Sequence, residues 1–213
     1  WGIDVSIAGS QKGMMLPPGL GFNALSEKSL AASKANTSTR AYWDWHAMIA
    51  NNKEGSFPFT PATNLLYGLK VAIAMMEEEG LENVWARHKR HGAATRAAVK
   101  AWGLELVCQD PHAYSPALTA VMVPGGHDAD AFRKVVLDNF DMSLGAGLNK
   151  IKGKAFRIGH LGHMNDLTLM GALAGIEMSL DIAKMPHRAG GVAAAMEVLK
   201  GRDVAAAPKV AVA

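Results

Sequence analysis

The sequence holds one cysteine, Cys108, among its 213 residues. A single thiol cannot build an internal disulfide framework, so nothing indicates an oxidising compartment and we expect a cytoplasmic protein. The sequence also lacks any apolar run near the ~18 residues that span a bilayer, and its first residues lack the pattern of a signal peptide. These absences exclude a disulfide-rich secreted domain and argue against a membrane protein.

The sequence has little excess charge and no cluster of one sign. Lys and Arg number 22 against 19 Asp and Glu, which gives a formal net charge of +3. The basic residues are scattered and form no stripe, so we expect no nucleic-acid partner, although a mildly basic protein suits an anionic small molecule. Hydrophobic residues make up 49% of the chain, which excludes a disordered protein and allows a sizeable core.

The first 35 residues read as strand, turn and short helix. Ile3, Val5 and Ile7 alternate along a strand over residues 1–8, and a glycine-bounded turn follows at 9–13. Pro and Gly interrupt residues 14–22, which favours an irregular or edge segment, and residues 26–35 predict a helix. Because the chain starts with Trp1 inside a strand, we expect it to be the C-terminal part of a longer protein.

A loop and two helices are predicted next. Residues 36–59 show no helical or strand period, so we expect a loop. Thr60 followed by Pro61 is typical of a helix start, with Thr60 as N-cap, and Gly80 is expected to end that helix. A second helix is expected from residue 81 to 102, closed by Gly103.

The last part of the chain alternates strands with helices. We expect strands at 104–108, 118–123 and 155–159, a helix at 128–139, and a long helix from the Asn165 cap to about residue 184. This order is typical of a small α+β domain. We therefore expect three parts: the end of a large domain over 1–95, a small α+β domain over 96–186, and a tail over 187–213 with one helix followed by disorder.

Lys12 is the sharpest candidate for chemistry. It lies directly after a strand, in a turn of small residues, so the scaffold fixes the position of its side chain. A lysine that binds a carbonyl cofactor covalently needs such an immobile stem, with room for a flat cofactor beside it. An ordinary surface lysine in a turn has the same spacing, and both interpretations remain open on spacing alone.

Several segments together resemble the class V aminotransferases, which use pyridoxal phosphate. The resemblance is carried by WGIDVSIAGSQKG (1–13), LPPGLGF (16–22), EEGLENVWARH (78–88), LGAGLNKIKGKAFRIGHLGHMND (144–166) and LAGIEM (173–178). It covers residues 1 to about 185 and corresponds to the C-terminal half of the family's chain. It implies an α/β protein of fold type I, here the end of the large domain and the small C-terminal domain.

The resemblance implies an activity and its partners. The last two motifs are close to the branch that transaminates L-serine with glyoxylate, giving hydroxypyruvate and glycine. Alternatives are an alanine–glyoxylate aminotransferase, a cysteine desulfurase of the same fold, or an inactive segment that only dimerises. The implied partners are small amino acids and 2-oxo acids and a second copy of the chain in a homodimer.

The resemblance also assigns roles to four residues. Lys12 would hold the cofactor covalently and carry protons, and Gln11 would contact the cofactor phosphate. Thr60 would reach the phosphate at the neighbouring subunit's site. Arg157, on the apolar strand AFRIG, would bind the substrate carboxylate with its planar fork.

Other polar residues receive structural interpretations. His160 and His163 are three residues apart, but no third ligand has suitable spacing, so we expect packing roles and no metal site. The basic run from Arg87 to His91 is expected to form a solvated helix face. Cys108 is expected in the core of a strand, which argues against a desulfurase because that chemistry needs a thiol on a mobile loop.

Overall fold

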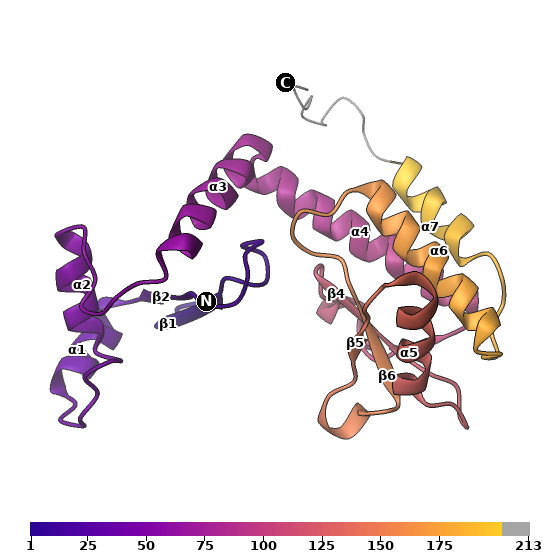
Figure 1. The fold of residues 1–213 in the computed structure, drawn as a ribbon, viewed down its shortest axis with the longest axis horizontal. Helices are drawn as coiled ribbons and strands as arrows, with labels where there is room; N and C mark the ends of the chain where they lie inside the picture. Colours follow the sequence, from indigo (N-terminus) through magenta and orange to yellow (C-terminus); the bar gives the residue numbers. More distant parts are fainter. Residues whose placement is uncertain (202–213) are drawn as a thin grey trace. The chain divides into compact units, whose positions relative to one another are not determined.

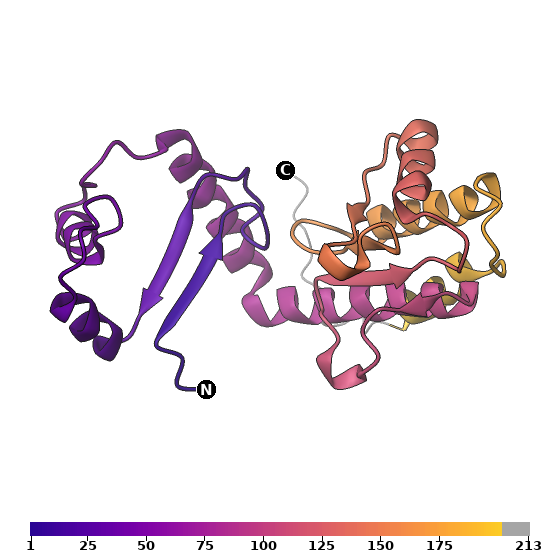
Figure 2. The same cartoon turned by 90° about the horizontal axis from the view of Figure 1, so that it is seen from below.

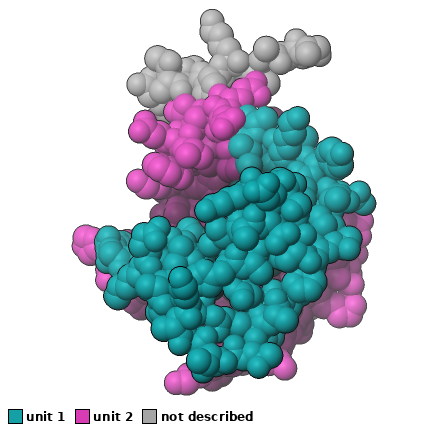
Figure 3. All heavy atoms as spheres, turned by 90° about the vertical axis from the view of Figure 1, so that its left-hand side faces the viewer, with its two compact units in different colours: residues 1–75 teal, residues 76–213 magenta. Residues whose placement is uncertain are grey.

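The computed structural model describes residues 1–201, and these form two compact units that divide between Met75 and Met76 (Figure 3). Each unit is described separately. The disorder expected at the end of the tail falls on residues 202–213, outside the described residues. None of the helices within residues 1–201 is long and apolar enough to cross a membrane.

The first unit contains a two-stranded antiparallel sheet and three helices (Figure 2). The strands pair so that Val5 faces Leu25 and Gly9 faces Gly21. As predicted, a strand opens the chain and a helix follows the Ser26 cap, whose hydroxyl accepts a hydrogen bond from the Ser29 N–H. The elements are β1 (Val5–Gly9), β2 (Gly21–Leu25), α1 (Glu27–Ala35), α2 (Trp45–Lys53) and α3 (Thr63–Glu79), the last turn of α3 belonging to the second unit.

Two expectations for this unit are wrong. The predicted loop over 36–59 contains α2, which the Asp44 carboxylate caps by accepting a hydrogen bond from the His46 N–H. Thr60 does not cap α3, because that helix begins at Thr63. The Pro61 carbonyl accepts a hydrogen bond from the Thr63 N–H at 2.9 Å, so the chain makes a turn before it enters the helix.

The first unit buries little of its own surface. Of its residues 1–75, all of them described, only Ser10 and Ala72 are buried. Large apolar side chains stand in solvent, among them Ile7, Trp43, Tyr67 and Val71. So many exposed large apolar side chains in one unit are typical of surface that packs against another protein surface.

The second unit is a four-stranded antiparallel sheet with helices packed against it (Figure 1). The strand order is β3-β4-β6-β5, so β5 lies at an edge. The predicted strands and helices occur in the predicted order, but the strand expected at 104–108 is only two residues long and the short edge strand β5 was not predicted. The elements are α4 (Leu81–Trp102), β3 (Glu105–Leu106), β4 (Leu118–Met122), α5 (Ala129–Phe140), β5 (Gly145–Ala146), β6 (Ala155–Gly159), α6 (Asp166–Ile182) and α7 (Gly191–Lys200), with 3₁₀ turns at Pro111–Ala113 and Asn149–Ile151.

The division into units does not coincide with the expected domain boundary after residue 95. All of α4 belongs to the second unit, because it packs against β3, β4, α6 and α7. A compact unit and a family domain are different divisions of a chain, so the boundary at residue 95 stays a prediction. The helix expected in the tail is α7, and it is an integral part of the second unit.

The core of the second unit lies between the sheet and its helices. Trp102 from α4, Phe132 from α5 and Phe156 from β6 are almost completely removed from solvent. The rings of Phe132 and Phe156 lie 4.9 Å apart in a tilted arrangement, a favourable aromatic contact. This packing fixes β6, the strand that carries Arg157.

Helix α7 is attached to α4 and α6 through its first turn. The Glu177 carboxylate accepts hydrogen bonds from the N–H groups of Gly190 at 2.5 Å and Val192 at 2.8 Å. Burial would raise the pKa of Glu177, but these donors outweigh it and hold the pKa below its usual range. A Cβ on Gly191 would lie 2.1 Å from Nε1 of Trp102, so the close approach of α7 to α4 requires a glycine there.

We predict that Gly191→Ala destabilises the second unit by ~1–3 kcal/mol, because the new methyl group must push α7 away from the buried Trp102 ring. Chemical denaturation measures the effect. Gly171→Ala is the matched control, since a Cβ at that position of α6 meets nothing within 4 Å. Equal unfolding free energies for Gly191→Ala and the wild type would contradict this account of the α4–α7 contact.

Candidate active site

A buried serine ties down the turn that carries Lys12. Ser10 is fully buried, and its hydroxyl donates to the Pro17 carbonyl at 2.7 Å and accepts from the Leu20 N–H at 3.1 Å. The Ser10 N–H donates to the Leu20 carbonyl, and the Ser10 carbonyl accepts from the Leu16 N–H, both at 3.1 Å. One residue therefore closes the loop between β1 and β2 from both ends.

Lys12 combines a fixed backbone with a free amino group. Its carbonyl accepts a hydrogen bond from the Met15 N–H at 3.0 Å, while its exposed ammonium has no hydrogen-bond or ion-pair partner among the described residues. Gln11 beside it is also exposed, and its amide folds back so that a Cβ on Gly9 would lie 2.7 Å from Oε1. An unpartnered amine and an amide on one constrained turn can hold a carbonyl cofactor with an anionic group.

Thr60 and Arg157 lie in different units. Thr60 is exposed on the stretch that leads from α2 to α3, and within residues 1–201 it shares no hydrogen bond with Gln11 or Lys12. The structure thus brings Gln11 and Lys12 together on one turn. It places Thr60 elsewhere in the same unit and Arg157 in the second unit.

Arg157 alternates with buried neighbours as its strand pattern predicts. Phe156 and Ile158 are buried, and Arg157 is half-buried. Its side chain has one partner within the unit, because Nε donates a hydrogen bond to the Ala146 carbonyl at 2.7 Å. The two terminal nitrogens have no partner among the described residues. They are the part of the guanidinium that remains free for an anionic ligand.

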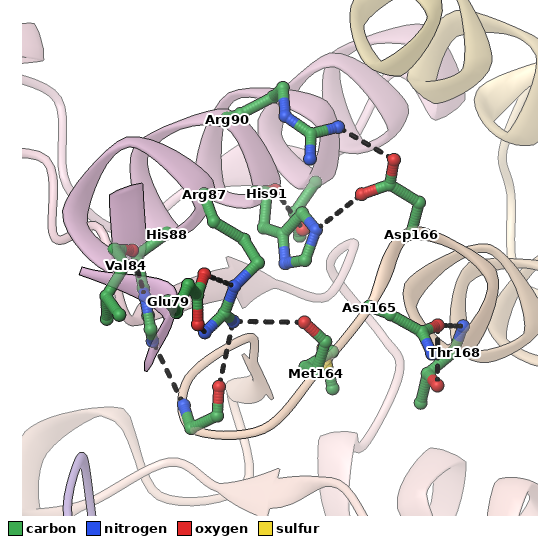
Figure 4. Close-up of polar contacts among 12 residues, drawn as sticks. Glu79, Val84, Arg87, His88, Arg90, His91, Met164, Asn165, Asp166 and Thr168 are labelled. Atoms are coloured by element: carbon green, nitrogen blue, oxygen red, sulfur yellow. Dashed lines mark hydrogen bonds and ion pairs between the residues drawn. The ribbon is translucent and has the colours of Figure 1, made fainter. Parts of the chain in front are cut away.

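Three side chains of α4, those of Arg87, His88 and His91, hold the segment from the end of β6 to the start of α6 (Figure 4). We call these three residues the clamp. Nη1 of Arg87 donates to the carbonyls of Gly162 at 2.9 Å and Met164 at 3.0 Å. The other nitrogens of Arg87 bind both carboxylate oxygens of Glu79, at 2.6 and 2.8 Å. The hydrogen bond from Arg87 holds the pKa of Glu79 below its usual value.

The histidines of the same helix complete the clamp. The Nδ1 of His88 lies 2.7 Å from the Val84 carbonyl, and its Nε2 accepts a hydrogen bond from the Gly162 N–H at 3.0 Å. Because a carbonyl can only accept, the His88 proton is assigned to Nδ1 and this contact uses the neutral ring. His91 is fully buried, and its Nε2 donates to Asp166 at 2.8 Å, while Arg90 binds the other oxygen of Asp166 at 2.9 Å.

The solvated helix face expected for residues 87–91 is therefore wrong. A signal for the clamp was present in the spacing of α4. The buried positions Thr95, Ala98 and Trp102 form a helical stripe, and extending it back by one turn reaches His91. One further turn reaches His88 and Arg87. The basic character of the run concealed this continuity.

His160 packs in the interior, as expected, and has a strongly perturbed pKa. It follows β6 directly and is fully buried. Its Nδ1 lies 3.0 Å from the Pro116 carbonyl, and its Nε2 lies 2.9 Å from the Thr119 hydroxyl, which fits a neutral ring that donates at Nδ1 and accepts at Nε2. Burial lowers the pKa of His160 to about 4.

Two remaining residues complete the comparison with the sequence. Cys108 lies two residues beyond β3, half-buried, with its thiol 3.4 Å from the Asp110 carbonyl, so its expected place in the core of a strand is wrong. His163 is exposed. Within residues 1–201, no three His, Cys, Asp or Glu side chains gather in a way that suits a metal ion.

We predict that the second unit loses stability as the pH falls from 6.5 towards 4. Unfolded His160 titrates near 6.5 and folded His160 near 4, so folding favours the neutral ring. This contribution is complete above pH ~6.5 and declines below it, by ~3 kcal/mol in total. His160→Gln, whose amide can replace both hydrogen bonds without titrating, should reduce the decline.

Denaturation at pH 7 and pH 4.5 measures this difference. The exposed His163 provides the control, and His163→Gln should leave the decline unchanged. Burial also lowers the pKa of His91, so part of the decline remains in His160→Gln. An identical pH dependence for His160→Gln and the wild type would rule out His160 as its source.

Comparisons with known proteins agree with the resemblance seen in the motifs. A family model described as aminotransferase class-V matches residues 1–149. A serine–glyoxylate aminotransferase of Methylorubrum extorquens is 46% identical over 97% of this chain and 53% of its own length. An L-aspartate–glyoxylate aminotransferase of Paracoccus denitrificans is 40% identical over 99% of this chain and 54% of its own length.

A solved structure, pyridoxamine–pyruvate aminotransferase from Mesorhizobium loti, matches with a TM-score of 0.85 and 33% identity. The match covers 92% of this chain and 52% of that chain. The chain thus spans about half the length of the curated relatives it matches.

Proposed function

The chain belongs to the class V aminotransferase family, and from this premise we propose that it forms the C-terminal half of a serine–glyoxylate aminotransferase. The proposed enzyme uses pyridoxal phosphate to move the amino group of L-serine to glyoxylate, giving hydroxypyruvate and glycine. A relative that carries this name is 46% identical over nearly all of the chain. The intact enzyme is proposed to be a cytoplasmic homodimer of fold type I.

The observation that carries the proposal is the constrained turn of Lys12. Its amine has no partner among the described residues, and the buried Ser10 fixes the backbone on which it stands. These features fit a cofactor that binds covalently through an aldehyde. When bound, pyridoxal phosphate supplies that aldehyde and a ring that withdraws electrons from the α-carbon of an amino acid.

We assign three residues to the cofactor. Lys12 would attach it and, once displaced by the amino acid, would move the proton from the α-carbon of the substrate to the aldehyde-derived carbon of the cofactor. Gln11 is the neighbouring residue on the turn, and its amide N–H would donate to the phosphate. Thr60 is assigned to the phosphate at the neighbouring subunit, with its hydroxyl as the donor, although it is not the N-cap of α3.

Arg157 is assigned to the substrate carboxylate. Its free terminal nitrogens offer two parallel N–H donors that match the two oxygens of a carboxylate. Every α-amino acid and 2-oxo acid presents that group, so Arg157 orients substrates without choosing between them. Alanine or aspartate as amino donor therefore remains the alternative to serine, the latter because of the aspartate–glyoxylate relative.

The exposed apolar side chains of the first unit support a dimer. Tyr67 and Val71 are one helical turn apart on α3, and both stand in solvent. Burying such side chains against a second copy is favourable, at ~1.5–3 kcal/mol for a fully buried large one. This surface gives the proposed dimer a source of stability.

We predict that Lys12→Ala abolishes transamination by the intact enzyme, because no other described residue is assigned to hold the cofactor and carry the proton. In the wild type, borohydride reduction followed by peptide mass analysis should find the cofactor fixed on Lys12. The control is Lys28→Ala, which removes an exposed lysine whose partner is Asp4. Wild-type turnover in Lys12→Ala would overturn the proposed function.

We predict that Arg157→Lys weakens serine binding about ten- to a hundredfold, equivalent to ~1.5–3 kcal/mol for hydrogen bonds to a charged group. Lysine keeps the charge but loses the fork. Serine and alanine should lose affinity equally, since both present the same carboxylate, and cofactor affinity should hardly change. Initial rates and thermal unfolding measure these effects. A variant that unfolds easily while its folded fraction binds serine normally would make Arg157 a structural residue.

A further inference from the structure

The side chain of Arg157 lies across the edge of the sheet, over a residue without a side chain. In the strand register, Arg157 on β6 faces Gly145 on β5 and Ala120 on β4. The guanidinium thus has the two smallest residue types on either side of it. Glycine at the edge strand is unusual, because it weakens a strand and leaves nothing to pack.

Gly145 is in close contact with Arg157. A Cβ on Gly145 would lie 3.1 Å from Cβ of Arg157, 3.2 Å from its Nε and 3.5 Å from its Cζ. The first two distances are shorter than ordinary van der Waals contacts between such atoms, so a methyl group here would require the Arg157 side chain to shift by a few tenths of an ångström. The backbone conformation of Gly145 does not itself require glycine, since its φ is not positive.

The carbonyl of the next residue fixes the direction of the guanidinium. Nε of Arg157 donates to Ala146 at 2.7 Å. Two residues back along the same edge, the Leu144 carbonyl accepts from Nε of Arg133 on α5, also at 2.7 Å. Arg133 is held in turn by an ion pair with Asp130 at 2.8 Å. The segment that orients Arg157 is therefore attached to α5.

We propose that Gly145 and the Ala146 carbonyl are positioning residues for the substrate carboxylate. They turn Arg157 so that its two terminal nitrogens, and not Nε, meet the carboxylate. Because Nε already donates to Ala146, a carboxylate can bind the guanidinium only through those terminal nitrogens. The inference rests on the proposed role of Arg157 and adds the residues that set its orientation.

The test compares Gly145→Ala with the wild type in the intact enzyme. We expect the KM for L-serine to rise about tenfold while kcat at saturating serine and cofactor affinity stay within about twofold, because alignment of the charged hydrogen bonds is lost but the reacting groups are not. Calorimetric titration with glycolate, a carboxylate without an amino group, should show a similar loss of affinity. Gly125→Ala is the control, since a Cβ there meets nothing within 4 Å.

A double-mutant cycle with Arg157→Lys shows whether Gly145 acts through the guanidinium. If it does, Gly145→Ala should change glycolate affinity less than about twofold when it is added to the Arg157→Lys variant. Full additivity would overturn the inference, and so would unchanged serine and glycolate affinities in Gly145→Ala. If instead the wild type binds neither ligand, or Arg157→Lys has no effect on binding, the proposed function itself fails.

Failure of Gly145→Ala to fold is also informative. The double variant Gly145→Ala, Arg157→Gly removes the side chain that the new methyl group would meet. Recovery of the thermal transition in the double variant would support the inference, because the glycine would then be required only by Arg157. Continued failure to fold would mean that β5 itself needs the glycine, and the inference would be wrong.

Discussion

On strand β6 a charged residue, Arg157, stands in sequence between two buried apolar residues, and the rest of the second unit accommodates its guanidinium. A charged group cannot enter the core without a partner, so the side chain of Arg157 runs to the edge of the sheet. That path needs a glycine on β5 and an edge carbonyl as acceptor. Helix α5 holds the same edge through Arg133. The orientation of one side chain therefore depends on two strands and a helix.

Arginine side chains replace missing backbone partners elsewhere in the unit. The chain between β6 and α6 has no strand beside it, yet each carbonyl there still needs a donor. Arg87 supplies donors to two of these carbonyls, and an ion pair with Glu79 keeps the guanidinium of Arg87 in place. His88 and Asp166 fasten the same segment to α4. The strand that carries Arg157 is thus fixed beyond its end as well as along its edge.

Local periodicity predicted most elements, because strand and helix periods depend on neighbouring residues. Strand 155–159 and the helices closed by Gly103 and opened by Asn165 were predicted within a few residues. Helix α2 was missed because its apolar residues follow no clear period. The Thr60–Pro61 pair suits a helix start, but the chain makes a turn after Pro61 and the helix begins only at Thr63.

Contacts between distant residues left little trace in the sequence. Arg87 and its acceptors at Gly162 and Met164 are more than seventy residues apart, so no local pattern could pair them. The glycine at 145 was visible, but its reason is the register that places it opposite Arg157. The catalytic assignment of Lys12 came from a family motif and not from spacing.

The contact of Trp102 with Gly191 also joins residues far apart in the sequence, and it has a consequence for the synthesis of the chain on the ribosome. Trp102 leaves the ribosome 89 residues before the glycine that covers it. At a translation rate of ~5–20 residues per second, α7 is synthesised several seconds after the part of α4 that it covers. During that interval the nascent chain lacks the helix that covers Trp102, a side chain that the finished protein buries completely.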